Sequence, residues 1–144
     1  MAPGKFRFLD EIAPSDAAFE VAADDLNELF AAAAEALFSV IIDLDEISLK
    51  VSRQVTVVAD TDVELLYDWL SQLVYLKDVY RELYARFDVS VVRTDQWRLT
   101  ATIHGDSVDG LREKTRTDVK AVTYHKLEVV KTDKGYKATV VVDL

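Results

Sequence analysis

Two stretches of helical periodicity within residues 1–80 interrupt a chain in which most other apolar residues alternate with polar ones. The first apolar stripe consists of Leu26, Leu29, Phe30, Ala33, Leu37 and Val40, and the second of Leu66, Trp69, Leu70, Leu73, Leu76 and Tyr80. Asp24 or Asp25 can cap the first stripe, and Thr61 with Glu64 forms a capping box before the second. We therefore predict two helices, and we expect Trp69 and Tyr75 to belong to the core and not to a binding patch.

The rest of the apolar pattern predicts β-strands that follow one another in neighbouring pairs. Alternation marks strands at 17–23, 87–91, 97–103, 119–130 and 137–142, with turn-like residues at 93–95 and 133–135. Residues 47–59 contain two period-two apolar runs, 47–51 and 55–59, separated by the polar Arg53. This interruption predicts one long strand with a bulge, or two short strands.

Paired strands with two helices inserted early predict an α+β fold: a mostly antiparallel sheet with two helices packed on one face. The 144 residues, of which 50% are hydrophobic, suit a single domain spanning residues 1–144. Only four glycines and two prolines are present, and no stretch has the composition of a linker.

Composition excludes several classes of site and compartment. Because the chain has no cysteine, it offers no disulfide, no thiolate zinc site and no cysteine nucleophile, which suits a reducing cytoplasm. Residues 1–8 lack the pattern of a signal peptide, and the longest apolar run, 29–42, is interrupted by Glu35 and is too short to span a bilayer. We expect a cytoplasmic protein that does not enter a membrane.

The net charge of −9 is unevenly distributed along the chain. Residues 1–46 contain eleven acidic residues against Lys5 and Arg7, whereas residues 112–137 contain eight basic residues against four acidic ones. An acidic surface repels polyanions, so no stable direct binding of nucleic acid is expected. The basic region is interpreted either as a solvated face or as one pole of a molecule that is polar from end to end.

Few residues could carry enzymatic chemistry. The two histidines, His104 and His125, lie on predicted strands without a nucleophile motif nearby, and no phosphate-binding glycine loop or paired-histidine helix occurs. Carboxylates are abundant near both ends of the chain, at Asp10, Glu11, Asp16 and Asp143. If the first and last strands are neighbours, these carboxylates can bind a hard divalent cation, since oxygen ligands suit calcium or magnesium.

Several stretches, in the same order along the whole chain, together resemble the archease family. They are residues 8–16 (FLDEIAPSD), 24–30 (DDLNELF), 64–76 (ELLYDWLSQLVYL), 119–125 (VKAVTYH) and the closing VVDL. The most specific is 119–125, which is similar to the family's strand almost residue for residue.

The resemblance implies a non-catalytic protein cofactor of the RNA ligase that uses GTP to join RNA ends in tRNA splicing or RNA repair. Archeases promote guanylylation of this ligase and its repeated turnover. The family's metal site implies Asp16, Asp143 and the main-chain oxygens of Leu144 as ligands, with Ca²⁺ the expected ion and Mg²⁺ or another divalent ion the alternative.

The loop before Asp16 departs from the family pattern. The family places a His-Thr-Ala triplet there, whereas Glu11 to Ser15 form a longer loop in this chain, which removes a histidine and can bring Asp10 or Glu11 into the site. Lys120 is the first choice for contact with the ligase; otherwise it is an exposed strand lysine. Two other functions stay open, a metal-dependent hydrolase and a chaperone-like assembly module.

Overall fold

The computed structural model describes residues 4–9 and 15–144. Its strands are β1 (Lys5–Leu9), β2 (Asp16–Ala23), β3 (Val51–Ala59), β4 (Glu82–Arg93), β5 (Trp97–Ser107), β6 (Ala121–Val122), β7 (Glu128–Lys131) and β8 (Tyr136–Asp143). Its helices are α1 (Leu26–Ile41) and α2 (Asp62–Tyr80), with short 3-10 turns at Leu44–Glu46, Val108–Gly110 and Arg112–Lys114.

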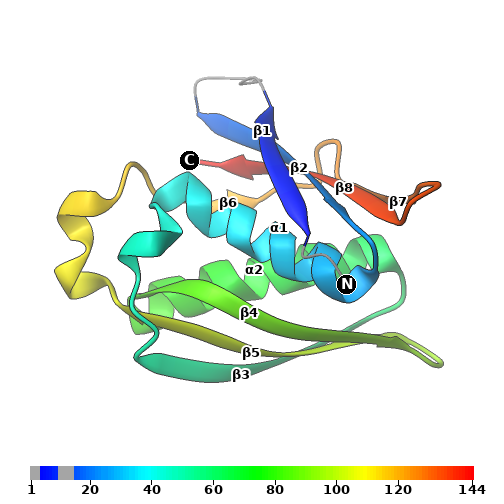
Figure 1. Cartoon of the computed structure of the whole chain (residues 1–144), viewed down its shortest axis with the longest axis horizontal. Helices are drawn as coiled ribbons and strands as arrows, with labels where there is room; N and C mark the ends of the chain where they lie inside the picture. Colours follow the sequence, from blue (N-terminus) through cyan, green and yellow to red (C-terminus); the bar gives the residue numbers. More distant parts are fainter. Residues whose placement is uncertain (1–3, 10–14) are drawn as a thin grey trace.

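The strands form two antiparallel sheets with the two helices between them (Figure 1). One sheet has the order β1-β2-β8-β6, with β7 also paired to β8, and the other has the order β3-β5-β4. Each helix contacts strands of both sheets, so the core lies in the helical layer and each sheet is covered on its inner face. The predicted α+β class with antiparallel strands and two helices is confirmed, although the strands divide into two sheets where the sequence suggested one.

Both helices begin where their capping residues predict. Asp25 accepts a hydrogen bond from the Glu28 N–H at 2.8 Å, and the Thr61 hydroxyl accepts one from the Glu64 N–H at 3.1 Å. Within the described part of the chain, no helix is long and apolar enough to cross a membrane.

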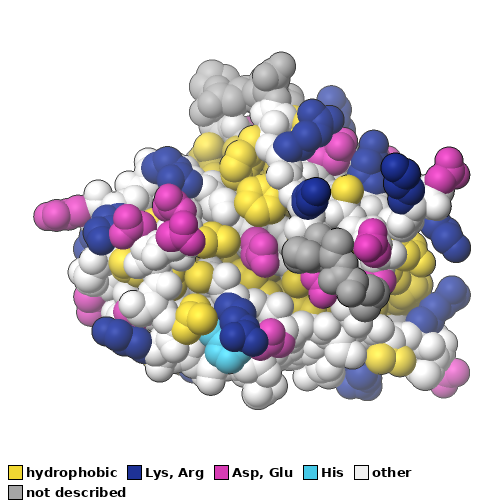
Figure 2. Space-filling view, viewed as in Figure 1, with side chains coloured by type: hydrophobic (Ala, Val, Ile, Leu, Met, Phe, Trp, Pro, Cys, Tyr) yellow, Lys and Arg dark blue, Asp and Glu magenta, His cyan; other side chains and the backbone are white. Residues whose placement is uncertain are grey.

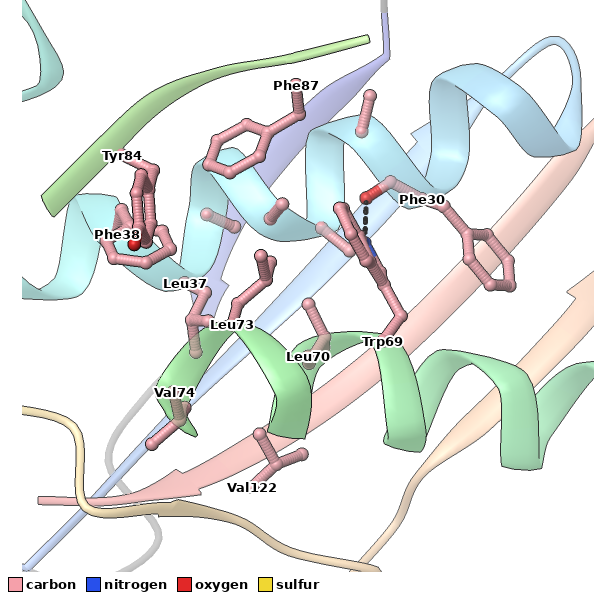
Figure 3. Packing of buried hydrophobic residues seen from close by; sticks show 14 of the residues in the cluster. Phe30, Leu37, Phe38, Trp69, Leu70, Leu73, Val74, Tyr84, Phe87 and Val122 are labelled. Carbon is pink, nitrogen blue, oxygen red and sulfur yellow. Dashed lines mark hydrogen bonds between the residues drawn. The ribbon is translucent and has the colours of Figure 1, made fainter. Parts of the chain in front are cut away.

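The indole of Trp69 links the two helices inside the core (Figure 3). Its side chain is fully buried, and its Nε1–H donates to the main-chain oxygen of Phe30 at 3.0 Å. The prediction for Trp69 is therefore confirmed. The same prediction was wrong for Tyr75, which is 59% exposed.

Two strand predictions were wrong in detail. The register of β3 with β5 is unbroken from Val51 to Ala59, so the predicted segment 47–59 contains one strand without a bulge, and residues 47–50 precede that strand. The predicted strand 119–130 is split into β6 and β7, which pair with different parts of β8. Lys126 has φ 54°, and this left-handed residue turns the chain between the two short strands. The first strand, β1, was not predicted.

One buried carboxylate on β4 connects the two outer strands of the smaller sheet, β4 and β3. Glu82 accepts hydrogen bonds from Arg53 Nε and Nη2, at 2.7 and 3.0 Å, and from the Tyr84 hydroxyl at 2.8 Å. The bond to Arg53 holds the pKa of Glu82 below its usual value, and burial raises the pKa of Tyr84. The Arg53 guanidinium also lies 3.3 Å from the centre of the Tyr80 ring.

Candidate carboxylate site at the end of the larger sheet

The pairing of β2 with β8 brings together two aspartates that are far apart in the sequence. Asp16 begins β2, Asp143 ends β8, and the antiparallel register sets them directly opposite each other. The condition for a shared cation site, that strands near the two ends of the chain are neighbours, is met at this pair.

Alternation along both strands fixes which face the two carboxylates share. The neighbouring pair, Ala17 and Val142, packs against the core, so the side chains of Asp16 and Asp143 point to the opposite, outer face of the sheet. Asp16 is half-buried and Asp143 is exposed. Side chains directly opposite on antiparallel strands lie close enough to interact, and two like charges there repel each other. A cation bound between the two carboxylates would relieve this repulsion.

Main-chain hydrogen bonds hold two further predicted residues beside the aspartates. The Leu144 N–H donates to the Ser15 oxygen at 2.8 Å, and the Lys120 N–H donates to the Asp143 oxygen at 2.9 Å. Ser15, Asp16, Lys120, Asp143 and Leu144 thus lie at one end of the sheet, where β2, β8 and the start of β6 meet. The resemblance did not single out Ser15, whose contribution comes from its main chain.

The donor chemistry of this end suits a hard divalent cation. Two carboxylates and the main-chain oxygens of Leu144 offer oxygen atoms, which calcium and magnesium prefer to nitrogen or sulfur. Among residues 4–9 and 15–144, no group of three or more acidic, histidine or cysteine side chains converges on a metal-sized space. The predicted contributions of Asp10 and Glu11 lie outside the described residues.

Exposed aromatic side chains lie beside Lys120. A cavity of about 200 Å³ between α2 and β6 is lined by Lys120, Val122 and Tyr75, among others. Close by, the rings of Tyr67 and Tyr124 stack 3.9 Å apart at an angle of 9°, and Tyr124 is 66% exposed. Periodicity could not identify this surface, because a stripe of helical aromatics looks the same whether it faces the core or solvent.

The basic region 112–137 does not form one patch. The turn Arg112–Lys114 and the β7–β8 hairpin lie at opposite ends of the molecule's long axis (Figure 1). Several of these cations are also paired within the chain: Lys114 Nζ lies 2.7 Å from Glu46, and Lys137 Nζ lies 3.5 Å from Glu20. The solvated-face interpretation fits this arrangement better than a single basic pole.

The histidines are not placed as a catalytic pair. His104 lies on β5, as predicted, with its Nε2 3.0 Å from Asp88, whereas His125 lies in the turn before β7 and not on a strand. Neither residue has a serine or threonine hydroxyl as a hydrogen-bond partner of its ring among the described side chains.

Comparison with known proteins gives consistent matches over nearly the whole chain. Residues 6–144 match the model of the Archease protein family. Protein archease of Methanosarcina barkeri is 37% identical over 142 residues, covering 97% of this chain and 96% of that protein. Protein archease of Archaeoglobus fulgidus is 40% identical over 144 residues, covering 97% and 99%.

Solved structures agree with these sequence matches. The solution structure of Methanobacterium thermoautotrophicum protein 1598 superimposes with a TM-score of 0.84 at 35% identity, over 96% of this chain and 98% of that one. The crystal structure of an archease from Thermotoga maritima, described as a possible chaperone, has a TM-score of 0.60 at 18% identity, over 92% and 93%, and supports the fold alone. The chain belongs to the archease family.

Proposed function

We propose that this protein is a non-catalytic cofactor of a GTP-dependent, tRNA-splicing RNA ligase, acting in the cytoplasm in tRNA splicing or RNA repair. Membership of the archease family supports this role. The observation that carries it is the cross-strand pair of Asp16 and Asp143, which puts two carboxylates on an exposed face beside Leu144.

In this proposal Asp16, Asp143 and the main-chain oxygens of Leu144 hold a divalent metal ion, calcium foremost. When bound, the ion supplies positive charge and open coordination positions for oxygen ligands of the ligase or its nucleotide. The protein's own groups position the site: hydrogen bonds from Leu144 to Ser15 and from Lys120 to Asp143 tie the strand ends together.

Lys120 is proposed to contact the ligase or a phosphate directly. Its side chain is exposed, and none of the described acidic residues forms an ion pair with it. Its main chain is bonded to Asp143, but its side chain lines the cavity on the α2 side of the sheet, so the ammonium group and the carboxylates lie on opposite faces of the same strand end. A partner that contacts both Lys120 and the carboxylates therefore has to reach around this end of the sheet with a surface that carries both charge signs.

The test is multiple-turnover RNA joining by the cognate ligase with GTP, with this protein added in substoichiometric amounts. We expect the parent to stimulate joining and the variants Asp16→Ala and Asp143→Ala, confirmed as folded, to lose most of the stimulation. Lys120→Glu should weaken stimulation without unfolding the domain, because its side chain is exposed. An exposed control variant, Glu113→Gln, should behave as the parent. Stimulation that survives both aspartate variants would contradict the proposed site.

A second candidate function, a chaperone-like assembly module, is favoured by apolar side chains left exposed on α2. Tyr75, Val79 and Tyr80 are 59, 52 and 48% exposed, and Tyr124 adds to this surface. Protection of unrelated aggregating clients at the same concentrations that stimulate the ligase would favour this candidate. Hydrolysis of phosphoesters by the purified protein without ligase would instead favour the metal-dependent hydrolase.

A further inference from the structure

The smaller sheet has a free strand edge on the side that faces α1. In the order β3-β5-β4, β4 pairs with β5 only, and its other edge runs beside α1 at the front of the molecule (Figure 1). The Val91 N–H donates to the Asn27 side chain at 2.7 Å, which shows that Val91 directs its main-chain groups away from β5.

Alternation extends this orientation along the strand. Val89 and Phe87 lie two and four residues before Val91 in an unbroken register with β5, so their N–H and C=O groups also point to the free edge. None of the described residues hydrogen-bonds to them on that side. The side chain of Asn27 therefore caps one position of the edge and leaves the next two open for pairing.

An open cavity of about 670 Å³ adjoins this edge. It is lined by β4 residues 85–90 and by Asn27, Glu28, Ala31 and Glu35 of α1, and it extends over β5 and β3 to residues 100–102 and Gln54. Neither Glu28 nor Glu35 forms an ion pair with a described cation, and burial together with the neighbouring Glu28 raises the pKa of Glu35. The space-filling view shows acidic side chains over α1 on this face (Figure 2). The groove thus combines main-chain groups and two carboxylates that no described residue pairs, while its one lining cation, Arg86, is paired with Asp88.

We propose that this groove, which we call the β4 groove, binds an extended segment of a partner protein that carries a lysine or arginine. The segment adds to the edge of β4 through hydrogen bonds with Phe87 and Val89, and its cation lies against Glu28 and Glu35. A second copy of this chain fits less well, because pairing of two β4 edges brings two acidic α1 faces together. RNA is repelled by the same carboxylates.

Val89→Pro removes the main-chain donor from the edge without removing a bond of the β4–β5 ladder, because that N–H points outward. The probe is a short capped peptide in which valine alternates with lysine, titrated into ¹⁵N-labelled protein by NMR. We expect saturable shifts of the Phe87 and Val89 amides in the parent and roughly three- to tenfold weaker binding by Val89→Pro. A matched peptide with glutamate in place of lysine should bind more weakly still.

Charge reversal tests the groove without altering the strand. Glu35→Lys should invert the preference of the protein from the lysine peptide to the glutamate peptide, with changes of about two- to fivefold each way. Glu113→Lys, an exposed reversal of equal charge outside the groove, should leave the preference unchanged. Equal binding of both peptides, absence of shifts at β4, or concentration-dependent dimers abolished by Val89→Pro would overturn the proposal. The carboxylate site belongs to the other sheet, so these results do not depend on it.

Discussion

Because Asp16 and Asp143 carry like charges, replacing either one should change the free energy of unfolding in opposite directions with and without a bound metal ion. The two side chains are direct cross-strand partners on an exposed face. At a separation of about 5 Å in a water-like dielectric, two like charges repel by about 0.8 kcal/mol, within the range found for cross-strand pairs. Replacing either residue by asparagine keeps the shape and removes the repulsion. In EDTA and low salt, Asp16→Asn and Asp143→Asn should therefore raise the free energy of unfolding by about 0.5–1 kcal/mol.

In calcium, the parent should instead be more stable than either asparagine variant. Bound only to the folded parent at one hundred times its dissociation constant, the ion adds about 2.7 kcal/mol to the free energy of unfolding, whereas the variants gain much less. The assay is urea unfolding followed by circular dichroism, in EDTA and in calcium, with Glu113→Gln as a control that shifts in neither buffer. High salt should shrink the gain seen in EDTA, because it screens exposed charges. Variants that are less stable than the parent in EDTA would refute the reasoning, and so would a parent that calcium does not stabilise.

Three further predictions concern the core. Glu82→Gln should lower the free energy of unfolding by about 2 kcal/mol at pH 7, because it weakens charged hydrogen bonds to a buried carboxylate. Since the folded pKa of Glu82 lies below its ordinary value of 4.5, that contribution is present above about pH 4.5 and is lost as pH falls through the folded pKa, so urea melts of parent and variant should converge in acid. Trp69→Phe should cost about 2–3 kcal/mol in the same melts, because it loses the bond to Phe30 and leaves a void. Lys77→Met should change stability by less than about 1 kcal/mol, because its two aspartate partners are exposed and can rehydrate; a loss above about 3 kcal/mol would contradict this.

Features determined by local sequence could be predicted without the structure. Both helices, their caps at Asp25 and Thr61, and the β4–β5 hairpin follow from periodicity and from turn and capping chemistry within a few residues. The division of the strands into two sheets could not be predicted, because alternation tells which side of a strand is apolar but not which strand it pairs with. The burial of Tyr75 was misjudged for a related reason: residues on a long helix can look alike in sequence and still face different layers.

Only part of the carboxylate site could be predicted in the same way. Pattern alone offered acidic residues near both ends, and the resemblance narrowed them to Asp16, Asp143 and Leu144. The pairing of Asp16 with Asp143 is a long-range property of the register, and the bonds through Ser15 and Lys120 involve main-chain atoms that carry no sequence signal. The β4 groove could not be predicted either, because the sequence does not show which strand edge is left without a pairing strand.

The central claim is that the paired aspartates act on the ligase, and guanylylation tests it most directly. The measurement is the rate at which the cognate ligase retains label from α-labelled GTP in the presence of calcium, with the parent protein, with Asp143→Asn, or with neither. We expect the parent to accelerate labelling and folded Asp143→Asn to leave it near the rate of the ligase alone. Equal acceleration by the parent and Asp143→Asn would contradict the claim.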